Sequence, residues 1–178
     1  MNEFALIQKY FKKLTYDNPS ALNLNDDVFF DKKNNVVVSS DTYVEGVHFL
    51  DFRKPDLVIK KILRSSISDL YCKGVKPKFI FIGASGNKKS FSKKNLNLVY
   101  KSLKQEQKKY KIKLSGGDTT KSNKTTFTIT SLGYSKKIVQ RNKCKNNDDI
   151  YVTGNLGDSY LGLSILKNKL FLKSTKLR

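Results

Sequence analysis

Short acidic side chains beside hydroxyl groups are the feature of this chain that most suggests chemistry. The 178 residues contain 12 aspartates but only 3 glutamates, whereas ordinary surface helices are rich in glutamate. Four aspartates lie in segments that also hold Ser, Thr or Gly, or a second Asp: LNDDVFF, VVVSSDT, SISDLY and SGGDTT. Carboxylate and hydroxyl oxygens are suited to hard cations and to phosphate chemistry. The four candidate residues are Asp27, Asp41, Asp69 and Asp118.

The elements around these aspartates suggest that they converge. Asp27, Asp41 and Asp118 are predicted at or just past a strand end or strand entrance, and Asp69 toward the end of a helix. Carboxylates gathered at one edge of a sheet repel one another unless a cation lies between them. Mg²⁺ fits such a place, because it takes a few carboxylates, keeps several waters and bridges substrate phosphates. A single aspartate is more typical of a turn or a helix cap, but the set of four favours a metal site.

Two glycines precede Asp118. Gly116 and Gly117 can let backbone N–H groups approach phosphate oxygens, although a glycine pair alone is more typical of a plain turn. The stretch GASGNKKS at residues 83–90 lacks the spacing of a phosphate-binding P-loop, and we expect a strand end and a solvated loop there. No G-x-S-x-G motif occurs, and the single histidine, His48, excludes a multi-histidine metal site. Metal and phosphate contacts are therefore the better use of the hydroxyls.

The basic residues are spread over the whole chain. The formal net charge is +20, but the lysines are mixed with asparagine and form no dense stripe, so nucleic acid is not the expected partner. The charge should still attract small phosphates. No apolar run approaches a membrane span, the N-terminus lacks a signal-peptide pattern, and Cys72 and Cys144 form no CxxC pair. We therefore expect a cytoplasmic protein with free thiols and no membrane partner.

Hydrophobic periodicity predicts both strands and helices. Helices are expected at residues 3–14, from residue 56 to a stop near residue 74, from a Ser92 cap to residue 110, and at residues 156–168. The expected strands read DVFF, NVVVSS, KFIFIGAS, KIKLS, TTFTITSLGYS and DDIYVTG, with the first two joined in a hairpin. This pattern favours an α+β fold, in which a mixed or antiparallel sheet has helices packed on one face.

Four segments together resemble a known family. The strings DD…VVVSSDTYVEGVHF, ISDLYCKGVKPKF, LSGGDTT and DDIYVTGNLGDSYLGLSIL are similar, in order and spacing, to thiamine-monophosphate kinase. That family belongs to the aminoimidazole-ribotide-synthetase-like superfamily of ATP-using enzymes, and the resemblance covers nearly the whole chain. It implies the N-terminal domain of the aminoimidazole-ribotide-synthetase-like fold. It also implies Mg²⁺-dependent transfer of the ATP γ-phosphoryl group to thiamine monophosphate, which gives thiamine diphosphate.

The resemblance implies roles for single residues. No side chain is expected to act as a chemical catalyst, because direct in-line attack by a phosphate oxygen of thiamine monophosphate needs mainly positioning and charge neutralisation. Several Mg²⁺ ions are expected, with ATP as co-substrate and His48 as a contact to the thiamine substrate. The implied metal ligands are Asp27, Ser39, Ser40, Asp41, Asp69 and Asp118, and the implied ATP contacts are Gly117, Asp118, Arg141 and Tyr100.

The sequence also departs from the family pattern. Asn25 replaces the glycine that usually precedes the DD pair. Tyr71, Cys72 and Lys73 replace the common Ala-Ala-Met. The turn that usually reads RSGAKPGD reads RNKCKNND here, so it has lost its glycine and proline. These changes surround the expected metal and ATP contacts.

The resemblance also bears on domains and assembly. Family members carry a second α/β domain. Residues 1–155 are expected to form the ATP- and Mg²⁺-binding N-terminal domain, and residues 156–178 to begin a truncated C-terminal domain, which would impair activity. The N-terminal domains of the family pair through their sheets, so a homodimer is expected.

Two other functions stay open. A sibling enzyme of the same superfamily, such as a selenophosphate synthetase or the purine ribotide synthetase, would want a catalytic Cys, selenocysteine or Lys in a glycine-rich N-terminal segment, and MNEFALIQKYFKK offers none. A non-catalytic module could bind nucleotides or RNA, with an RNA affinity that falls steeply with salt. The intact aspartates argue against that module, because a polyanion binder does not need them.

Overall fold

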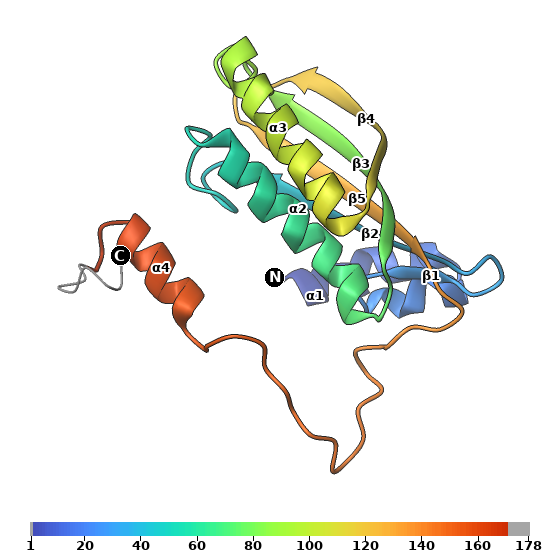
Figure 1. The fold of residues 1–178 in the computed structure, drawn as a ribbon. Helices are drawn as coiled ribbons and strands as arrows, with labels where there is room; N and C mark the ends of the chain where they lie inside the picture. The colour runs from blue at the N-terminus through green and yellow to red at the C-terminus, as the bar shows by residue number, and fades with distance from the viewer. Residues whose placement is uncertain (1, 171–178) are drawn as a thin grey trace. The chain divides into compact units, whose positions relative to one another are not determined.

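A five-stranded mixed sheet forms the centre of the structure, a computed structural model that describes residues 2–170 (Figure 1). The chain divides into two compact units, residues 1–143 and residues 144–178, and each is considered by itself. The strands are β1 (Phe29–Asp31), β2 (Val36–Val44), β3 (Pro77–Gly86), β4 (Lys113–Lys121) and β5 (Thr126–Tyr134), all in the first unit.

The strand order in the sheet is β1-β2-β5-β3-β4. β3 and β4 are parallel, and every other pair is antiparallel. The predicted hairpin is confirmed, because β1 pairs with β2 in the register Phe30 to Val37. The last strand in sequence, β5, lies between β2 and β3. This insertion separates β2 from β4 by two strands and decides which predicted site residues can meet.

Helices α2 (Pro55–Cys72) and α3 (Lys93–Tyr110) lie side by side over one face of the sheet (Figure 1). The predicted cap of α3 is confirmed, because the Ser92 hydroxyl accepts the Asn95 N–H at 3.4 Å. The buried isoleucines and leucines of α2 recur at helical spacing and form the apolar face of a packed helix, whereas Leu57 is exposed. The α+β fold with helices on one face is therefore confirmed. The core between helices and sheet includes Ile59, Ile62, Leu63, Ile67, Ile80 and Ile129.

The opposite face of the sheet carries no helix in the part of the first unit that is described. Side chains alternate along a strand, so Ser40 and Thr42 of β2 point away from the helices and are exposed. Their hydroxyls pair with those of Thr130 and Thr128, at 2.9 Å in each case. Toward β1 and β3 the same face becomes apolar. Its aromatic residues are Phe29, Phe79, Phe81 and Tyr134, of which Phe81 is 38% exposed.

The N-terminal segment is helical but irregular, where one helix over residues 3–14 was expected. A four-residue helix α1 (Glu3–Leu6) continues as a wide turn η1 (Ile7–Phe11) and then as a 3₁₀ turn η2 (Lys12–Thr15). Tyr16 has φ 48° and ends the run in a left-handed conformation. A further 3₁₀ segment, η3 (Pro19–Leu24), leads to β1.

Two strand predictions need correction. SGGDTT was expected to follow a strand, but it lies inside β4, an edge strand with β3 as its partner. Residues 148–154 were expected to be the last strand, yet they form no strand in the structure. A β-rich run becomes a strand only beside a partner for its N–H and C=O groups, and this segment pairs with none among residues 2–170. The final helix is confirmed as α4 (Asp158–Leu166).

Candidate active site

Three of the four predicted aspartates come together at one end of the first unit. Asp27 comes just before β1, Asp41 lies in β2, and Asp69 lies in the last turns of α2. Asp41 and Asp69 are close enough to interact directly, and the charge of Asp27 also acts on Asp69. The hairpin and the packing of α2 on β2 are what bring these residues together, since 42 positions separate the first from the last.

Asp41 and Asp69 form the half of this cluster that has no basic partner. The Ser39 hydroxyl donates a 2.8 Å hydrogen bond to Asp69 Oδ2, and the Tyr43 hydroxyl donates a 3.1 Å bond to Asp41 Oδ2. Ser39, Asp41 and Tyr43 share the helix-facing side of β2, because they alternate along the strand. None of the ion pairs within residues 2–170 includes Asp41 or Asp69.

Burial and neighbouring charge change the protonation of Asp69. Burial raises its pKa to about 6, the Ser39 hydrogen bond opposes that rise, and the charges of Asp41 and Asp27 add to it. The pKa of Tyr43 is also raised, mainly by burial and further by Asp41. A pair of adjacent carboxylates that holds a proton in this way is poised to exchange it for a cation.

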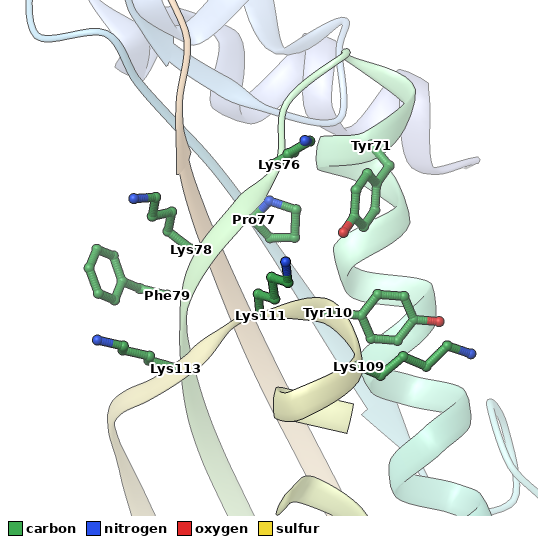
Figure 2. A pocket seen from close by; sticks show the side chains of 9 residues that line it. All are labelled: Tyr71, Lys76, Pro77, Lys78, Phe79, Lys109, Tyr110, Lys111 and Lys113. Atoms are coloured by element: carbon green, nitrogen blue, oxygen red, sulfur yellow. The ribbon is translucent and has the colours of Figure 1, made fainter. Parts of the chain in front are cut away.

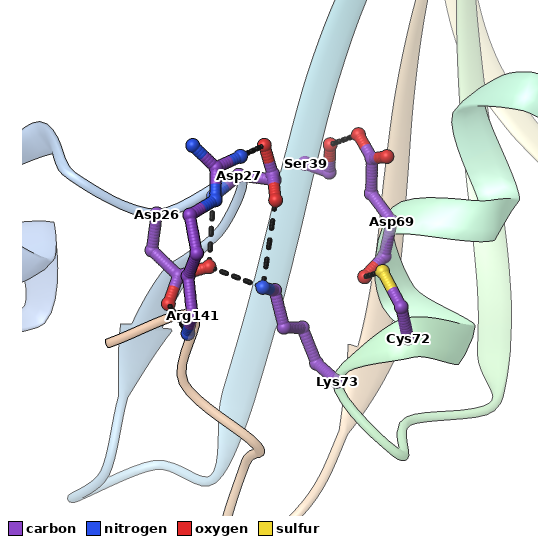
Figure 3. A network of polar contacts seen from close by, with 7 residues as sticks. All are labelled: Asp26, Asp27, Ser39, Asp69, Cys72, Lys73 and Arg141. Carbon is purple, nitrogen blue, oxygen red and sulfur yellow. Dashed lines mark hydrogen bonds and ion pairs between the residues drawn. The ribbon is translucent and has the colours of Figure 1, made fainter. Parts of the chain in front are cut away.

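The second half of the cluster is electrically balanced (Figure 3). Lys73 places its ammonium group 2.5 Å from Asp26 Oδ1 and 3.4 Å from Asp27 Oδ2. Arg141 pairs through its guanidinium with Asp27, and its backbone N–H donates to Asp26 Oδ2 at 3.1 Å. Burial alone would raise the pKa of Asp26, but Lys73 and the N–H groups of Arg141 and Asp27 hold that pKa below its usual range.

His48 lies beside the first half of the cluster. Its ring packs edge-on against Tyr43, with centroids 5.8 Å apart. The backbone N–H of Val44 donates to His48 Nδ1 at 3.0 Å, which leaves Nε2 to carry the proton of the neutral ring. The Lys61 ammonium group donates to the His48 carbonyl.

Asp118 is not part of the cluster. It pairs with Gly83 of β3, which pairs with Thr128 of β5, which pairs with Thr42 of β2. Three strand spacings separate Asp118 from Thr42, or roughly 14 Å at the usual distance between strands. Within one chain, Asp118 therefore cannot share a metal ion with Asp41, and the expected convergence of four aspartates is wrong for a single copy.

Gly117 and Asp118 instead help to line a cavity of about 640 Å³ between β4 and α3. Its wall is largely apolar and includes Leu96, Val99 and Leu103 of α3. Tyr100, the fourth predicted ATP contact, is an exposed residue of the same helix. Gly117 has no room for a side chain. A Cβ atom on Gly117, whose φ is +154°, would lie 2.0 Å from the Ile82 carbonyl oxygen.

Ser40 is placed apart from the other predicted metal ligands. Ser39 faces the helices and contacts Asp69, whereas the Ser40 side chain points to the opposite face and pairs with Thr130. Only a backbone oxygen of Ser40 is left to serve a metal on the side of Asp41. The resemblance had left hydroxyl and backbone oxygen open for both serines, and the alternation of β2 separates the two hydroxyls.

The oxygen donors at Asp41 and Asp69 have the chemistry that Mg²⁺ takes, but they do not form a complete ligand set. No three His, Cys, Asp or Glu side chains among residues 2–170 are arranged as a finished metal site. Asp41, Asp69 and Ser39 nevertheless supply adjacent oxygen donors without a balancing cation, which is the donor chemistry that Mg²⁺ takes with waters and substrate phosphates. The residues present therefore fit the ion in part, and a bound phosphate would supply further oxygens.

Three residues of the cluster were not assigned from sequence. Asp26 is the inner acid of the DD pair, and only burial distinguishes it from Asp27. Tyr43 is one alternation beyond Asp41, so its place on the helix side could have been found from strand periodicity. Lys73 was noticed as a departure, but nothing in the sequence indicated that a lysine would be buried there.

A second cavity contains none of the predicted site residues (Figure 2). It has a volume of about 590 Å³ and lies where α2 and α3 end and β3 and β4 begin. Tyr71 and Tyr110 form one wall, with ring centroids 6.4 Å apart. Its basic residues are Lys76, Lys78, Lys109, Lys111 and Lys113.

In the part of the chain that the structure describes, no helix is long and apolar enough to cross a membrane.

This chain has a sheet with two helices on one face and a cluster of acidic residues at one end. These two features define its class of protein. Residues 17–135 match the family described as AIR synthase related protein, N-terminal domain. The chain belongs to that family.

Curated relatives within the family carry one name. The chain is 37% identical to the thiamine-monophosphate kinase of Buchnera aphidicola subsp. Schizaphis graminum over 187 residues, which cover 99% of this chain and 55% of that protein. It is 33% identical to the thiamine-monophosphate kinase of Haemophilus influenzae, over 92% of this chain and 51% of that protein. The chain thus spans about half the length of the curated relatives it matches.

Solved structures agree with this placement. A structure described as AaThiL complexed with AMPPCP and TMP matches 97% of this chain and 55% of its own, with a TM-score of 0.84 and 26% identity. The thiamine-monophosphate kinase of Stenotrophomonas maltophilia matches 98% of this chain and 56% of its own, with a TM-score of 0.65 and 25% identity.

Proposed function

We propose that this chain provides the nucleotide- and metal-binding half of a thiamine-monophosphate kinase. The reaction is phosphorylation of thiamine monophosphate by ATP to give thiamine diphosphate. The observation that carries the proposal is the pair Asp41 and Asp69, two adjacent carboxylates that form no ion pair within residues 2–170, in a chain with thiamine-monophosphate kinases among its curated relatives. Because ATP is the co-substrate, we propose the cytoplasm as the compartment of the reaction.

Mg²⁺ is the proposed metal, and Asp41, Asp69 and Asp27 are its proposed side-chain ligands, with Ser39 beside them. When bound, Mg²⁺ neutralises phosphate charge and holds two anionic substrates together. Ser39 and Tyr43 keep the two carboxylates oriented, because each donates one hydrogen bond to one of them. Ser40 is kept in the proposal through its backbone oxygen only.

Arg141 is proposed to bind ATP phosphates by exchanging partners. Its side chain is about half exposed and pairs with Asp27, so the guanidinium can turn toward a phosphate without unfolding its surroundings. A guanidinium suits this role because its planar N–H groups match phosphate oxygens in pairs. Its backbone N–H stays on Asp26 and holds the segment in place.

His48 is proposed to contact thiamine monophosphate. Its Nδ1 is occupied by the Val44 N–H, so the neutral ring can donate only from Nε2. A donor there suits a phosphate oxygen of the substrate, and the Lys61 ammonium group beside the His48 carbonyl favours an anion in the same region. The transfer itself is proposed to be direct and in line, with no phosphorylated side chain, because the charge balance and positioning suffice.

A homodimer is proposed to complete the site. Gly117 and Asp118 lie on β4, roughly three strand spacings from Asp41, and Tyr100 lies on α3. The uncovered face of the sheet carries Phe81 and Tyr134, which are 38% and 52% exposed. Pairing of two such faces would bury these rings and bring the Asp118 of one copy toward the acid cluster of the other.

The direct test is a product assay. The chain is incubated with ATP, Mg²⁺ and thiamine monophosphate, and thiamine diphosphate is measured by chromatography. Binding of Mg²⁺ and the ATP analogue AMPPCP is measured on the same sample by calorimetry. Product shows that these 178 residues suffice. Metal-dependent nucleotide binding without product means that the remaining half of the kinase is required. If the chain binds neither the ATP analogue nor thiamine monophosphate, the proposal is contradicted.

A further inference from the structure

We infer that the Lys73 ammonium group occupies a cation position between Asp26 and Asp27, so that this chain binds one divalent ion fewer than it would with an uncharged residue there. The inference rests on the proposed function, because it concerns the same acid cluster. It assigns Lys73 a positioning role and assigns the divalent metal to Asp41 and Asp69, with Asp27 as a further ligand once Arg141 turns to a phosphate.

The contacts of Lys73 are those of an ion with ligands on two sides. Its Nζ is 2.5 Å from Asp26 Oδ1 and 3.4 Å from Asp27 Oδ2 (Figure 3). The side chains of Lys73 and Asp26 are each 5% exposed. A lysine is almost never buried to this extent unless it is paired, so the carboxylates hold the ammonium group in a fixed place.

The backbone around Lys73 is fixed as well. Helix α2 ends in a Schellman motif, in which the Val75 N–H donates to the Leu70 carbonyl at 2.9 Å and the Gly74 N–H to the Tyr71 carbonyl at 2.9 Å. The Lys73 carbonyl accepts the Val139 N–H at 3.1 Å. Lys73 therefore enters the acid cluster from a rigid helix end, and its side chain is not a mobile surface group.

The oxygens of Asp26 and Asp27 already have cations or N–H groups as partners. Asp26 Oδ1 accepts from Lys73 and from the Asp27 N–H at 2.9 Å, and Asp26 Oδ2 accepts from the Arg141 N–H. Asp27 Oδ1 pairs with Arg141 and Oδ2 faces Lys73. When Arg141 turns to a phosphate, Asp27 gains one free oxygen, but Lys73 still balances the charge of Asp26.

The two halves of the cluster differ in charge. Asp26 and Asp27 face two cations, Lys73 and Arg141, and sum to zero. Asp41 and Asp69 accept hydrogen bonds from hydroxyl groups and, within residues 2–170, take part in no ion pair. A divalent ion loses bound water when a protein binds it. It therefore binds best to carboxylates whose charge is not already balanced by another cation. The metal is therefore expected at Asp41 and Asp69, and an additional ion at Asp26 is excluded for as long as Lys73 is charged.

The test counts metal ions. Mn²⁺ serves as the probe, and bound Mn²⁺ per chain is measured by electron paramagnetic resonance, alone and with AMPPCP. The wild type is compared with Lys73→Met, an uncharged chain of similar length, and with Lys73→Arg, which keeps the charge. Lys73→Met is expected to bind one more Mn²⁺ per chain than the wild type, and Lys73→Arg the same number. Equal numbers in all three proteins would overturn the inference.

A second measurement separates a lost ion from a lost fold. Without metal, Lys73→Met leaves the buried Asp26 and the more exposed Asp27 facing only Arg141, so its melting temperature is expected to fall and to recover with Mg²⁺ far more than that of the wild type. The double variant Asp26→Asn/Lys73→Met removes the excess charge and is expected to fold without metal and to bind no additional ion. A double variant that still gains an ion would place that ion elsewhere and overturn the inference. If the wild type binds Mn²⁺ but not AMPPCP, the proposed kinase function fails while the ion count still decides the role of Lys73.

Discussion

Ser39 of β2 donates a 2.8 Å hydrogen bond to Asp69 of α2 and so joins the strand and the helix that hold Asp41 and Asp69, the carboxylates proposed to bind the metal. Ser39 is only 3% exposed, and α2 is held against the sheet by the main hydrophobic core. The position of Asp69 is therefore determined by the fold before any ligand binds. A site of this kind contributes positioning, which is what phosphoryl transfer most requires from a protein.

The raised pKa of Asp69 predicts a pH dependence of stability. Burial raises this pKa to about 6, whereas an unfolded aspartate titrates near a pKa of about 3.9. The folded state therefore holds the proton more tightly, so the contribution to stability is fully present below about pH 4 and is lost as the pH rises through about 6. Asp69→Asn removes that contribution, because asparagine does not titrate.

Thermal unfolding without divalent ions checks this. From pH 4 to pH 7, the melting temperature of the wild type is expected to fall relative to that of Asp69→Asn. The comparison uses the difference between the two proteins, because other groups such as Asp26 have lowered pKa values and change stability in the opposite direction. Parallel melting curves across this pH range would mean that Asp69 titrates in the folded protein as it does in the unfolded chain.

Gly117 is predicted to be required for the fold itself. A Cβ atom at this position would lie 2.0 Å from the Ile82 carbonyl oxygen of β3, and its φ of +154° is one that side chains rarely adopt. Gly117→Ala is therefore expected to weaken the pairing of β4 with β3 by about 2 kcal/mol, which lowers the melting temperature by about 4–8 °C. The measurement is thermal unfolding by circular dichroism.

Gly116→Ala is the matched control. A Cβ atom there meets only the Phe81 ring, at 3.0 Å, and a side chain at the open face can move aside. Its melting temperature is expected to stay within about 2 °C of the wild type. If both variants unfold at the same temperature, the fold does not require glycine at position 117 for steric reasons.

The elements of the fold could be predicted from sequence where the signal is local. Helices α2 and α3 follow from apolar residues at helical spacing and from the Ser92 cap, and the β1–β2 hairpin follows from two β-rich runs around a turn. The placement of Asp118 could not be predicted in this way. It depends on β5 lying between β2 and β3, and strand order is a long-range property that residue spacing does not encode.

The site shows the same division. Asp41 and Asp69 were identified as candidates by residue type and neighbours, and the structure brings them together. The Asp26–Lys73 pair was missed because the decisive quantity is burial. In a chain with 35 basic residues, the sequence does not distinguish Lys73 from the other lysines. The structure does, because it shows Lys73 buried and paired with Asp26.

Asp118→Asn is predicted to remove Mg²⁺-dependent ATP binding while leaving the fold intact. The carboxylate is exposed on β4 and, within residues 2–170, bonds only to the neighbouring Thr119 N–H, at 2.8 Å. Its loss should therefore not change the melting temperature. The affinity for AMPPCP with Mg²⁺, measured by calorimetry, is expected to fall at least about tenfold, or about 1.4 kcal/mol.

Asp56, in the first turn of α2, is none of the proposed metal or nucleotide contacts and provides a control for loss of one negative charge. Asp56→Asn is expected to bind AMPPCP and Mg²⁺ as the wild type does. If Asp118→Asn also binds normally, Asp118 is not a nucleotide or metal contact, and the cavity beside Gly117 loses its proposed ligand.

The uncovered face of the sheet predicts how the dimer is broken. Phe81 lies at the middle of this face, opposite Thr130 in the pairing of β3 with β5, and is 38% exposed. Because the side chain points away from the helix-covered core, Phe81→Glu should fold, but it places a charge where two apolar faces would meet. Interface aromatics of this kind contribute about 2 kcal/mol or more, so the dimer dissociation constant is expected to rise about 30-fold, measured by sedimentation. Lys101→Glu, on the exposed side of α3, is the control and should leave the dissociation constant unchanged.

If the dimer is the route by which Asp118 reaches the acid cluster of the other copy, Phe81→Glu also weakens Mg²⁺-dependent AMPPCP binding at protein concentrations where the wild type is dimeric. A monomeric wild type, or a Phe81→Glu variant that dimerises normally, would exclude this face as the interface.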